Sequence, residues 1–157
     1  MNEEEKAFLI QAGYKFEFNP ARDAGSVTEG WLVIAGGISN VSPEGNEEID
    51  QTAYYDGGGF ASSDVIGKQD VYSFEGHRLY GDAAQDYIFD NLAHKVGPAR
   101  NGTFRVTDPK GNTLVGNSTV ANISGAGGAA NSKGEVSFEI HYNGLPTFTP
   151  AAGGAGL

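Results

Sequence analysis

The sequence predicts a mainly β protein, an antiparallel β-sandwich or partly closed barrel with one α-helix on its flank. Several short stretches alternate apolar and polar residues with a period of two, the pattern of strands that bury one face. The chain has 24 glycines in 157 residues, about twice the average usage, and they separate these stretches as turns do. Only one segment has helical periodicity, and no alternation of strands and helices indicates a doubly wound fold.

The length is that of one domain. We expect an N-terminal arm over residues 1–12, a β domain over 13–148 that contains a long loop at 56–68, and a flexible C-terminal tail over 149–157 that is rich in Gly and Ala. The arm has an apolar cluster on a polar leader, and such a cluster needs a surface to bury against. Both the chain's own domain and a partner remain possible surfaces for Phe8, Leu9 and Ile10.

The first half of the β domain contains the first predicted strands. Residues 14–18 alternate strictly, which predicts a strand with one buried face. The continuous apolar run 31–35 predicts a strand covered on both faces or a subunit interface. An extended segment at 38–41 leads to a turn at 42–45, and 47–55 returns as the next strand.

The segment 56–68 is predicted to be the least structured part of the middle of the chain. Three consecutive glycines give it conformational entropy to lose on ordering. A dispensable loop needs no apolar residues, so those present predict that it folds against a partner, with the loop's own domain as the alternative. The predicted contact residues are Tyr55, Asp56, Gly57, Gly58, Gly59, Phe60, Val65 and Ile66.

The helix is the best-marked element of the sequence. Asp82 is the predicted N-cap and Gln85 follows three residues later, as in a capping box. Gly97-Pro98 ends the pattern after about 14 residues. The apolar stripe that faces a sheet consists of Ala84, Ile88 and Leu92.

The remaining strands are predicted at 69–79, 103–107, 113–123 and 135–142. The turn between the second and third of these, at 108–112, has Pro and Gly where turns favour them, and 125–131 is expected to be a loose connection. The last strand has the cleanest alternation of the chain, and its inward residues are Val136, Phe138, Ile140 and Tyr142.

Composition excludes several classes of function. Twenty acidic against ten basic residues leave a net charge of −10, so most of the surface should repel nucleic acid. The chain has no cysteine, hence no disulfide framework or thiolate metal site. No apolar run approaches the ~20 residues that span a bilayer, and the N-terminus is acidic where a secretory signal is basic. We therefore expect a soluble protein made in the cytoplasm, without a membrane partner.

Motifs for catalysis are also missing from the sequence. The histidines at 77, 94 and 141 lack metal-ligand spacing, and Gly57-Gly58-Gly59 is not followed by the Lys of a phosphate-binding loop. There is no GxSxG nucleophile elbow. The sequence thus predicts no enzyme, no catalytic or metal-binding residue and no cofactor.

Several segments, in this order, resemble the tail-tube (major tail) proteins of long-tailed siphophages. A strand and turn, Gly37-Ile38-Ser39-Asn40-Val41-Ser42-Pro43-Glu44-Gly45, precede an acidic strand, Glu47-Glu48-Ile49-Asp50-Gln51-Thr52-Ala53-Tyr54-Tyr55-Asp56, that opens into the glycine-rich loop. The helix start and the later turn are similar too, as is the ending Gly144-Leu145-Pro146. The resemblance covers roughly residues 31–148, and the two intervening segments are Gly81-Asp82-Ala83-Ala84-Gln85 and Asp108-Pro109-Lys110-Gly111.

This resemblance implies a structural subunit of a phage virion, assembled in the host cytoplasm. Six copies would form a ring, and rings would stack helically into a hollow tube that ends at terminator and initiator proteins. DNA and the tape-measure protein would pass through the lumen without specific binding, and the loop after Tyr55 and the N-terminal arm would reach the neighbouring ring. We expect no added immunoglobulin-like domain. The candidate lumen acids, for which the outer surface is the alternative, are Glu47, Glu48, Asp50, Glu135 and Glu139.

Two other functions remain open from the sequence. The inner tube of a type VI secretion-like machine shares the architecture. A carbohydrate-binding or adhesive β-sandwich needs an aromatic platform, which Tyr54, Tyr55 and Trp31 could supply, although the apolar run around Trp31 indicates a core position.

Overall fold

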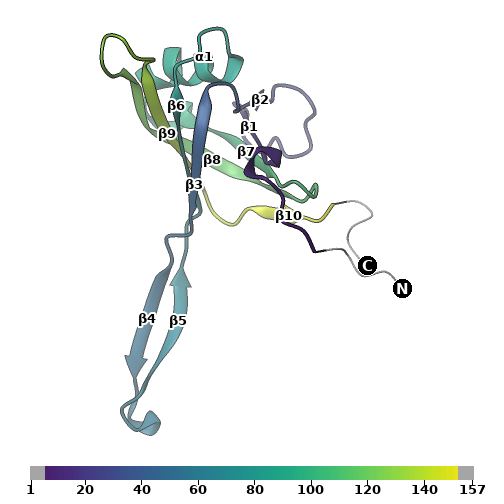
Figure 1. The fold of residues 1–157 in the computed structure, drawn as a ribbon. Helices are drawn as coiled ribbons and strands as arrows, with labels where there is room; N and C mark the ends of the chain where they lie inside the picture. Colours follow the sequence, from purple (N-terminus) through teal and green to yellow (C-terminus); the bar gives the residue numbers. More distant parts are fainter. Residues whose placement is uncertain (1–5, 152–157) are drawn as a thin grey trace.

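The computed structural model describes residues 6–151 as a curled antiparallel sheet with one helix, from which a long two-stranded arm projects (Figure 1). The main sheet has eight strands in the order β2-β1-β7-β8-β9-β6-β3, with β10 paired to β8. The predicted mainly β, partly closed barrel with a flanking helix is confirmed. The strands are β1 (Lys15–Asn19), β2 (Leu32–Val33), β3 (Ile38–Glu44), β4 (Glu48–Ala53), β5 (Ala61–Gly67), β6 (Val71–His77), β7 (Asn101–Thr107), β8 (Thr113–Gly127), β9 (Glu135–Tyr142) and β10 (Thr147–Thr149).

Aromatic rings fill the inner side of the curled sheet. Phe74 of β6 is fully buried and stacks on Phe138 of β9 with ring centroids 4.9 Å apart. Phe16 of β1 meets Phe74 edge to face at 5.3 Å. Tyr142 closes one end of the core, and its hydroxyl donates to the carbonyl of Leu114 at 2.7 Å. The period-two pattern therefore gives one continuous core in the body, as expected for strands that each bury one face.

The helix α1 (Ala83–Asp90) begins where the sequence predicts and ends early. The Asp82 carboxylate accepts a hydrogen bond from the backbone N–H of Gln85 at 3.1 Å, which confirms the N-cap. The expected 14-residue helix is wrong because α1 has eight residues and passes through Asn91 into short 3₁₀ turns, η3 (Leu92–His94) and η4 (Gly97–Arg100). Leu92 is still buried, because η3 continues the apolar face of α1 before the chain enters β7.

Gln85 fastens the helix to the sheet edge. Its side-chain amide donates to the carbonyls of Gly36 and His77, both at 2.9 Å, and its carbonyl accepts from the backbone N–H of Leu79 at 2.8 Å. Gly37 has φ +77° beside this amide, and a Cβ there would lie 2.5 Å from the Gln85 nitrogen. Glycine is therefore required where β3 begins.

The structure corrects several predicted boundaries. The run 31–35 contains only the two-residue strand β2; the next residue, Ile34, is buried in the core and still donates its backbone N–H to the carbonyl of Phe16 at 2.8 Å. The expected turn at 42–45 is wrong: Pro43 lies within β3, an edge strand that tolerates a residue without an N–H. The expected loose connection at 125–131 is wrong in its first part, since β8 runs to Gly127 with irregular register.

The two ends of the described chain lie near one turn of the body. Gly13 packs against Pro109, while Ala151 donates its backbone N–H to the Asn112 side chain at 2.8 Å and lies beside Gly111. The expected flexible tail over 149–157 starts too early, because Thr149 belongs to β10. Residues 152–157 of that tail and residues 1–5 of the expected N-terminal arm lie outside the described range. Within the described range, no helix is long and apolar enough to cross a bilayer.

Candidate assembly surfaces

The arm is a β-hairpin that continues the β3–β6 ribbon out of the body (Figure 1). Its strands β4 and β5 pair from Glu48–Gly67 out to Ala53–Ala61, and the 3₁₀ turn η2 (Tyr55–Gly57) forms its end. The expected irregular loop over 56–68 is therefore wrong in its second half. Ser, Ala, Asp and Gly in β5 are weak strand formers, so the strand has little sequence signal and depends on hydrogen bonds from β4.

The two faces of the arm differ in character. One face has the cross-strand pair Ile49–Val65, and both side chains are exposed. The other face sets Asp50 directly opposite Asp64, a like-charge pair that weakens the hairpin. An isolated two-stranded hairpin is only marginally stable in water. The arm thus lacks the contacts that would make it rigid within one copy of the chain.

Aromatic side chains surround the tip of the arm. Tyr54 is exposed, Tyr55 is fully exposed and Phe60 is 83% exposed. Gly58 and Gly59 have φ of +69° and +92°, so these two turn positions favour glycine. Of the predicted loop contacts, Val65 and Ile66 lie within β5 nearer the body, while residues 55–60 form the tip of the arm.

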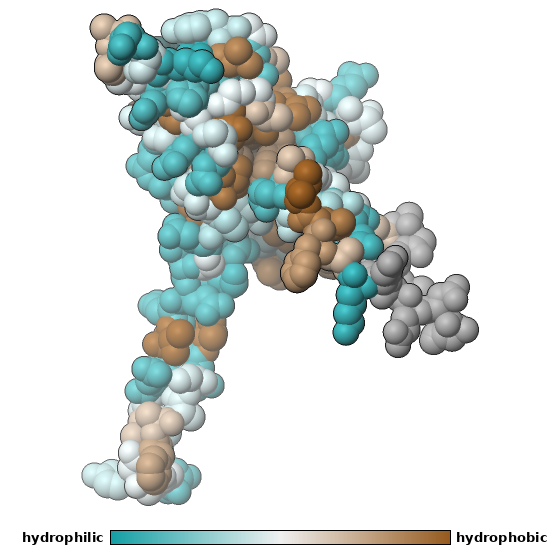
Figure 2. Space-filling model, viewed as in Figure 1, coloured by the Kyte–Doolittle hydropathy of each residue, from teal (hydrophilic) through white to brown (hydrophobic). Residues whose placement is uncertain are grey.

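The N-terminal segment forms a second exposed apolar surface. Phe8, Leu9 and Ile10 are all exposed, and Figure 2 shows apolar colour over this part of the body. The segment reaches the 108–112 turn through Gly13, as β10 does through Ala151. Exposed Phe148 of β10 adds to the apolar side chains at this end of the body. Residues 147–149 gave no strand signal, because three residues are too few to show an alternation.

Five candidate lumen acids fall in two different places. Glu135 and Glu139 lie on β9, on the sheet face opposite the aromatic core. Glu47, Glu48 and Asp50 instead lie where the arm leaves the body and in the half of the arm nearer the body.

The sheet places a further acid on the polar face with the two from β9. Glu75 of β6 pairs with Ser137, next to Glu139 on the same face. The Glu139 carboxylate lies 2.9 Å from His141 Nε2 and accepts from Asn122 at 2.8 Å. These two hydrogen bonds lower the pKa of Glu139, and the one with His141 has the larger effect. Sequence reasoning missed Glu75 because only the β6–β9 register reveals its neighbours.

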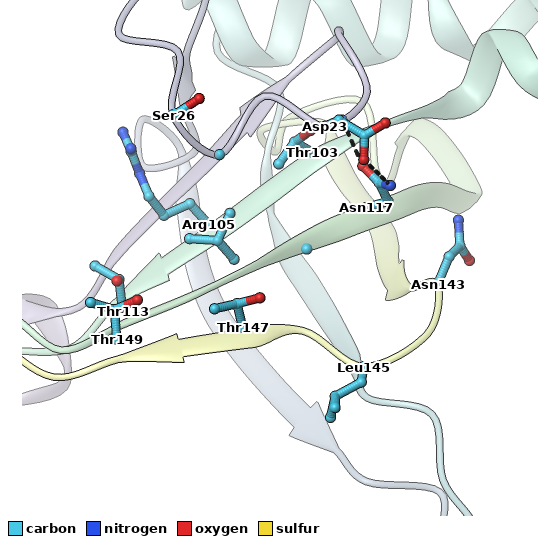
Figure 3. Close-up of a pocket in the computed structure, with 13 residues that line it drawn as sticks. Asp23, Ser26, Thr103, Arg105, Thr113, Asn117, Asn143, Leu145, Thr147 and Thr149 are labelled. Atoms are coloured by element: carbon cyan, nitrogen blue, oxygen red, sulfur yellow. Dashed lines mark hydrogen bonds between the residues drawn. The ribbon is translucent and has the colours of Figure 1, made fainter.

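A groove of about 700 Å³ lies on the polar side of the sheet, between the loop after β1 and β10 (Figure 3). Asp23 and Asn117 hold one side together through two hydrogen bonds of 2.8 Å each. Arg105, at the other side, is committed to Glu17 at 2.8 Å. Four threonines from β7, β8 and β10 contribute to the remaining wall, together with apolar Val115 and Leu145. The groove therefore offers hydroxyls and paired polar groups, with no base beside a nucleophile.

The remaining chemical candidates are dispersed. Among residues 6–151 no three His, Asp or Glu side chains are grouped as metal ligands. Trp31 lies in the body with the Arg105 guanidinium 4.0 Å from its ring centroid, and it is outside the core that its apolar run indicated. Tyr54 and Tyr55 are at the end of the arm, so these three rings do not form one platform (Figure 1).

Comparisons with solved structures identify the fold. A chain from the tail of an empty gene transfer agent particle, described with six-fold symmetry, superposes with a TM-score of 0.65 at 17% identity, covering 90% of this chain and 99% of that one. The SPP1 tail tube gives 0.65 at 15% identity, covering 90% and 79%. A chain of the sheath–tube complex of an extracellular contractile injection system gives 0.56 at 13% identity, covering 88% of each.

No protein-family model matches the chain, and no curated protein matches it in sequence. The curled antiparallel sheet with one helix is nevertheless the fold found in these tube-forming assemblies, as the sequence resemblance predicts.

Proposed function

We propose that this chain is a structural subunit that polymerises into the hollow tube of a phage tail. The observation that carries the proposal is the arm, which leaves a finished body and exposes apolar side chains along its length. The fold shared with tail tubes supports it. The subunit acts by assembly alone and catalyses nothing.

The contacts that complete the arm come from other copies of the chain. Among residues 6–151, its apolar face and its aromatic tip remain exposed and are not covered by the body to which it is attached. Contact between different patches on successive copies is heterologous and generates rings or open helical assemblies. Six copies per ring is the number that the six-fold symmetry of the gene transfer agent tail supports. The exposed Phe8, Leu9 and Ile10 would add a second contact between rings.

The polar sheet face suits the wall of a channel for DNA. Glu75, Glu135 and Glu139 share this face, and the whole chain has a net charge of −10. Like charge on wall and phosphate leaves no ion pairs to break as DNA moves. DNA and a tape-measure protein would pass through this lumen, and terminator and initiator proteins would close the tube in the virion. Glu47, Glu48 and Asp50 remain candidates for the bore where the arm begins.

Electron microscopy of the purified protein tests the proposal. We expect hollow tubes built from six-fold rings, formed above a critical concentration. A variant in which residues 54–60 are replaced by an Asn-Gly turn keeps the Ala53–Ala61 pairing with a favourable two-residue connection. This shortened variant should remain a folded monomer, which circular dichroism and gel filtration measure.

Each result has a distinct meaning. If the shortened variant forms tubes as readily as the native protein, the role of the arm is wrong. If the native protein stays monomeric at high concentration and within its own particle, the tube function is wrong.

A tube of a contractile machine, such as a type VI-like system, is the second candidate. The likeness to the sheath–tube complex favours it, because the fold serves both kinds of assembly. Microscopy of the native particle separates the two: a bare flexible tail supports the phage tail, and a contractile sheath around the tube supports the alternative.

A further inference from the structure

The segment His94–Arg100 forms an exposed surface at the end of the body where α1 lies. All residues from 94 to 99 are exposed, and Val96 is 87% exposed. The segment is nevertheless held in place. The Arg100 guanidinium donates to the carbonyl of Lys95 at 3.0 Å and to that of Val120 at 3.2 Å. It therefore presents the exposed Val96 side chain on a backbone that is held in place.

The segment contains three basic residues in an acidic protein, of which Lys95 is exposed and Arg100 is bonded to backbone carbonyls. His94, Lys95 and Arg100 occur within seven residues, whereas the whole chain has only ten Lys and Arg against twenty acids. The tip of the arm has the opposite character, with Asp56 between the exposed rings of Tyr55 and Phe60. The two surfaces are complementary, because each presents apolar groups together with one sign of charge.

The arm and α1, which the basic segment follows in the chain, lie at opposite ends of one copy (Figure 1). β6 runs from the base of the arm to the end of the body where α1 begins, and the basic segment follows α1 through η3 before the chain enters β7. The arm points away from this end, so its tip meets the segment only in another copy. Complementary patches at opposite ends give a head-to-tail contact that repeats along an axis.

We propose that the arm tip of one copy binds the His94–Arg100 segment of a copy in the adjacent ring. This inference rests on the proposed tube function and assigns the receiving surface. Tyr55 and Phe60 pack on Val96 and its neighbours, and Asp56 pairs with Lys95. An aromatic contact rimmed by an ion pair is the usual anatomy of a specific interface.

Cysteine cross-linking tests the contact directly, since the native chain has no cysteine. Tyr55→Cys protein and tagged Val96→Cys protein are mixed, assembled into tubes and oxidised. We expect a mixed disulfide dimer, which forms only when the two Cα atoms come within about 7 Å. The matched control replaces Val96→Cys with tagged Val27→Cys, another exposed valine, on the loop between β1 and β2, and should give no mixed dimer.

The outcomes separate this inference from the tube function. Tubes without a 55–96 link, or with Tyr55→Cys linked instead to Phe8→Cys, overturn the receiving surface and leave the tube function intact. Absence of tubes from the native chain contradicts both.

Charge exchange gives an independent measurement. Lys95→Glu should raise the critical concentration for tubes at least tenfold, and adding Asp56→Lys should restore most of the loss. Failure of the double variant to recover, with both proteins folded, would remove the Asp56–Lys95 pairing from the model.

Discussion

The body and the arm of this protein are built from the same kind of antiparallel pairing and differ in what surrounds it. Strands β6 and β9 bury Phe74 and Phe138 between the sheet and α1, whereas β4 and β5 leave Ile49 and Val65 in water. Hydrogen bonds between strands contribute little net stability, and burial of apolar side chains decides whether a sheet persists. The difference teaches that the body has a core of its own, while the arm exposes apolar side chains that we propose another copy covers.

The largest expected difference between the two regions comes from removing one aromatic ring. Phe74→Ala empties a fully buried site bordered by three rings and should lower the free energy of unfolding by about 3–5 kcal/mol. Phe60→Ala, at the arm tip, should change it by no more than about 0.5 kcal/mol. Urea denaturation of unassembled protein measures both values. Comparable losses would mean that the arm is part of the folded core.

A smaller contrast comes from one amide in each region. Gln85→Leu keeps the side-chain size and leaves the carbonyls of Gly36 and His77 and the N–H of Leu79 without their partner, at an expected cost of about 2–3 kcal/mol. Gln51→Leu on the arm loses one exposed hydrogen bond to Ser63, at an expected cost below about 0.5 kcal/mol. Thermal unfolding of the two variants side by side tests this. If Gln85→Leu is neutral, the attachment of α1 to the sheet edge depends on packing alone.

The smallest effect depends on pH and concerns Glu139 on the polar face. Its hydrogen bonds with His141 and Asn122 lower its pKa from the ordinary value of 4.5. A group with a lowered folded-state pKa contributes stability above its unfolded pKa, and this contribution is lost as pH falls through the folded value. The melting temperature of the native protein should therefore exceed that of Glu139→Gln above about pH 5, and the gap should close on acidification. A gap that widens in acid would mean that the carboxylate is not stabilised by these donors.

Strong local signals in the sequence were confirmed where they coincide with the packing. The alternation at 135–142 predicts β9 with its inward residues, and the structure buries every second side chain. The Asp82 cap is set by neighbours three residues apart and needs no tertiary information. The apolar side chains of the candidate site were also noticeable, because Phe8 and Phe60 stand in polar or glycine-rich surroundings, but the sequence left open whether the chain's own domain covers them, and only the structure shows them exposed.

The features that the sequence did not reveal share a physical cause. β5 has the composition of a loop and becomes a strand only because β4 lies beside it. Glu75 joins Glu139 on one face through the pairing of strands far apart in the chain. The exposure of the basic segment after α1 is revealed only once the body is assembled. Each depends on contacts between distant residues, which periodicity does not encode.

The sequence by itself determined the fold class, the helix start, the acidic character and the presence of apolar groups without an obvious place in the core. These follow from local periodicity, capping chemistry and composition. The tertiary structure alone decided that the glycine-rich region is a projecting hairpin, which acids share a face, and that the arm and α1 lie at opposite ends. Register and direction arise only when strands from distant parts of the chain pair around a common core.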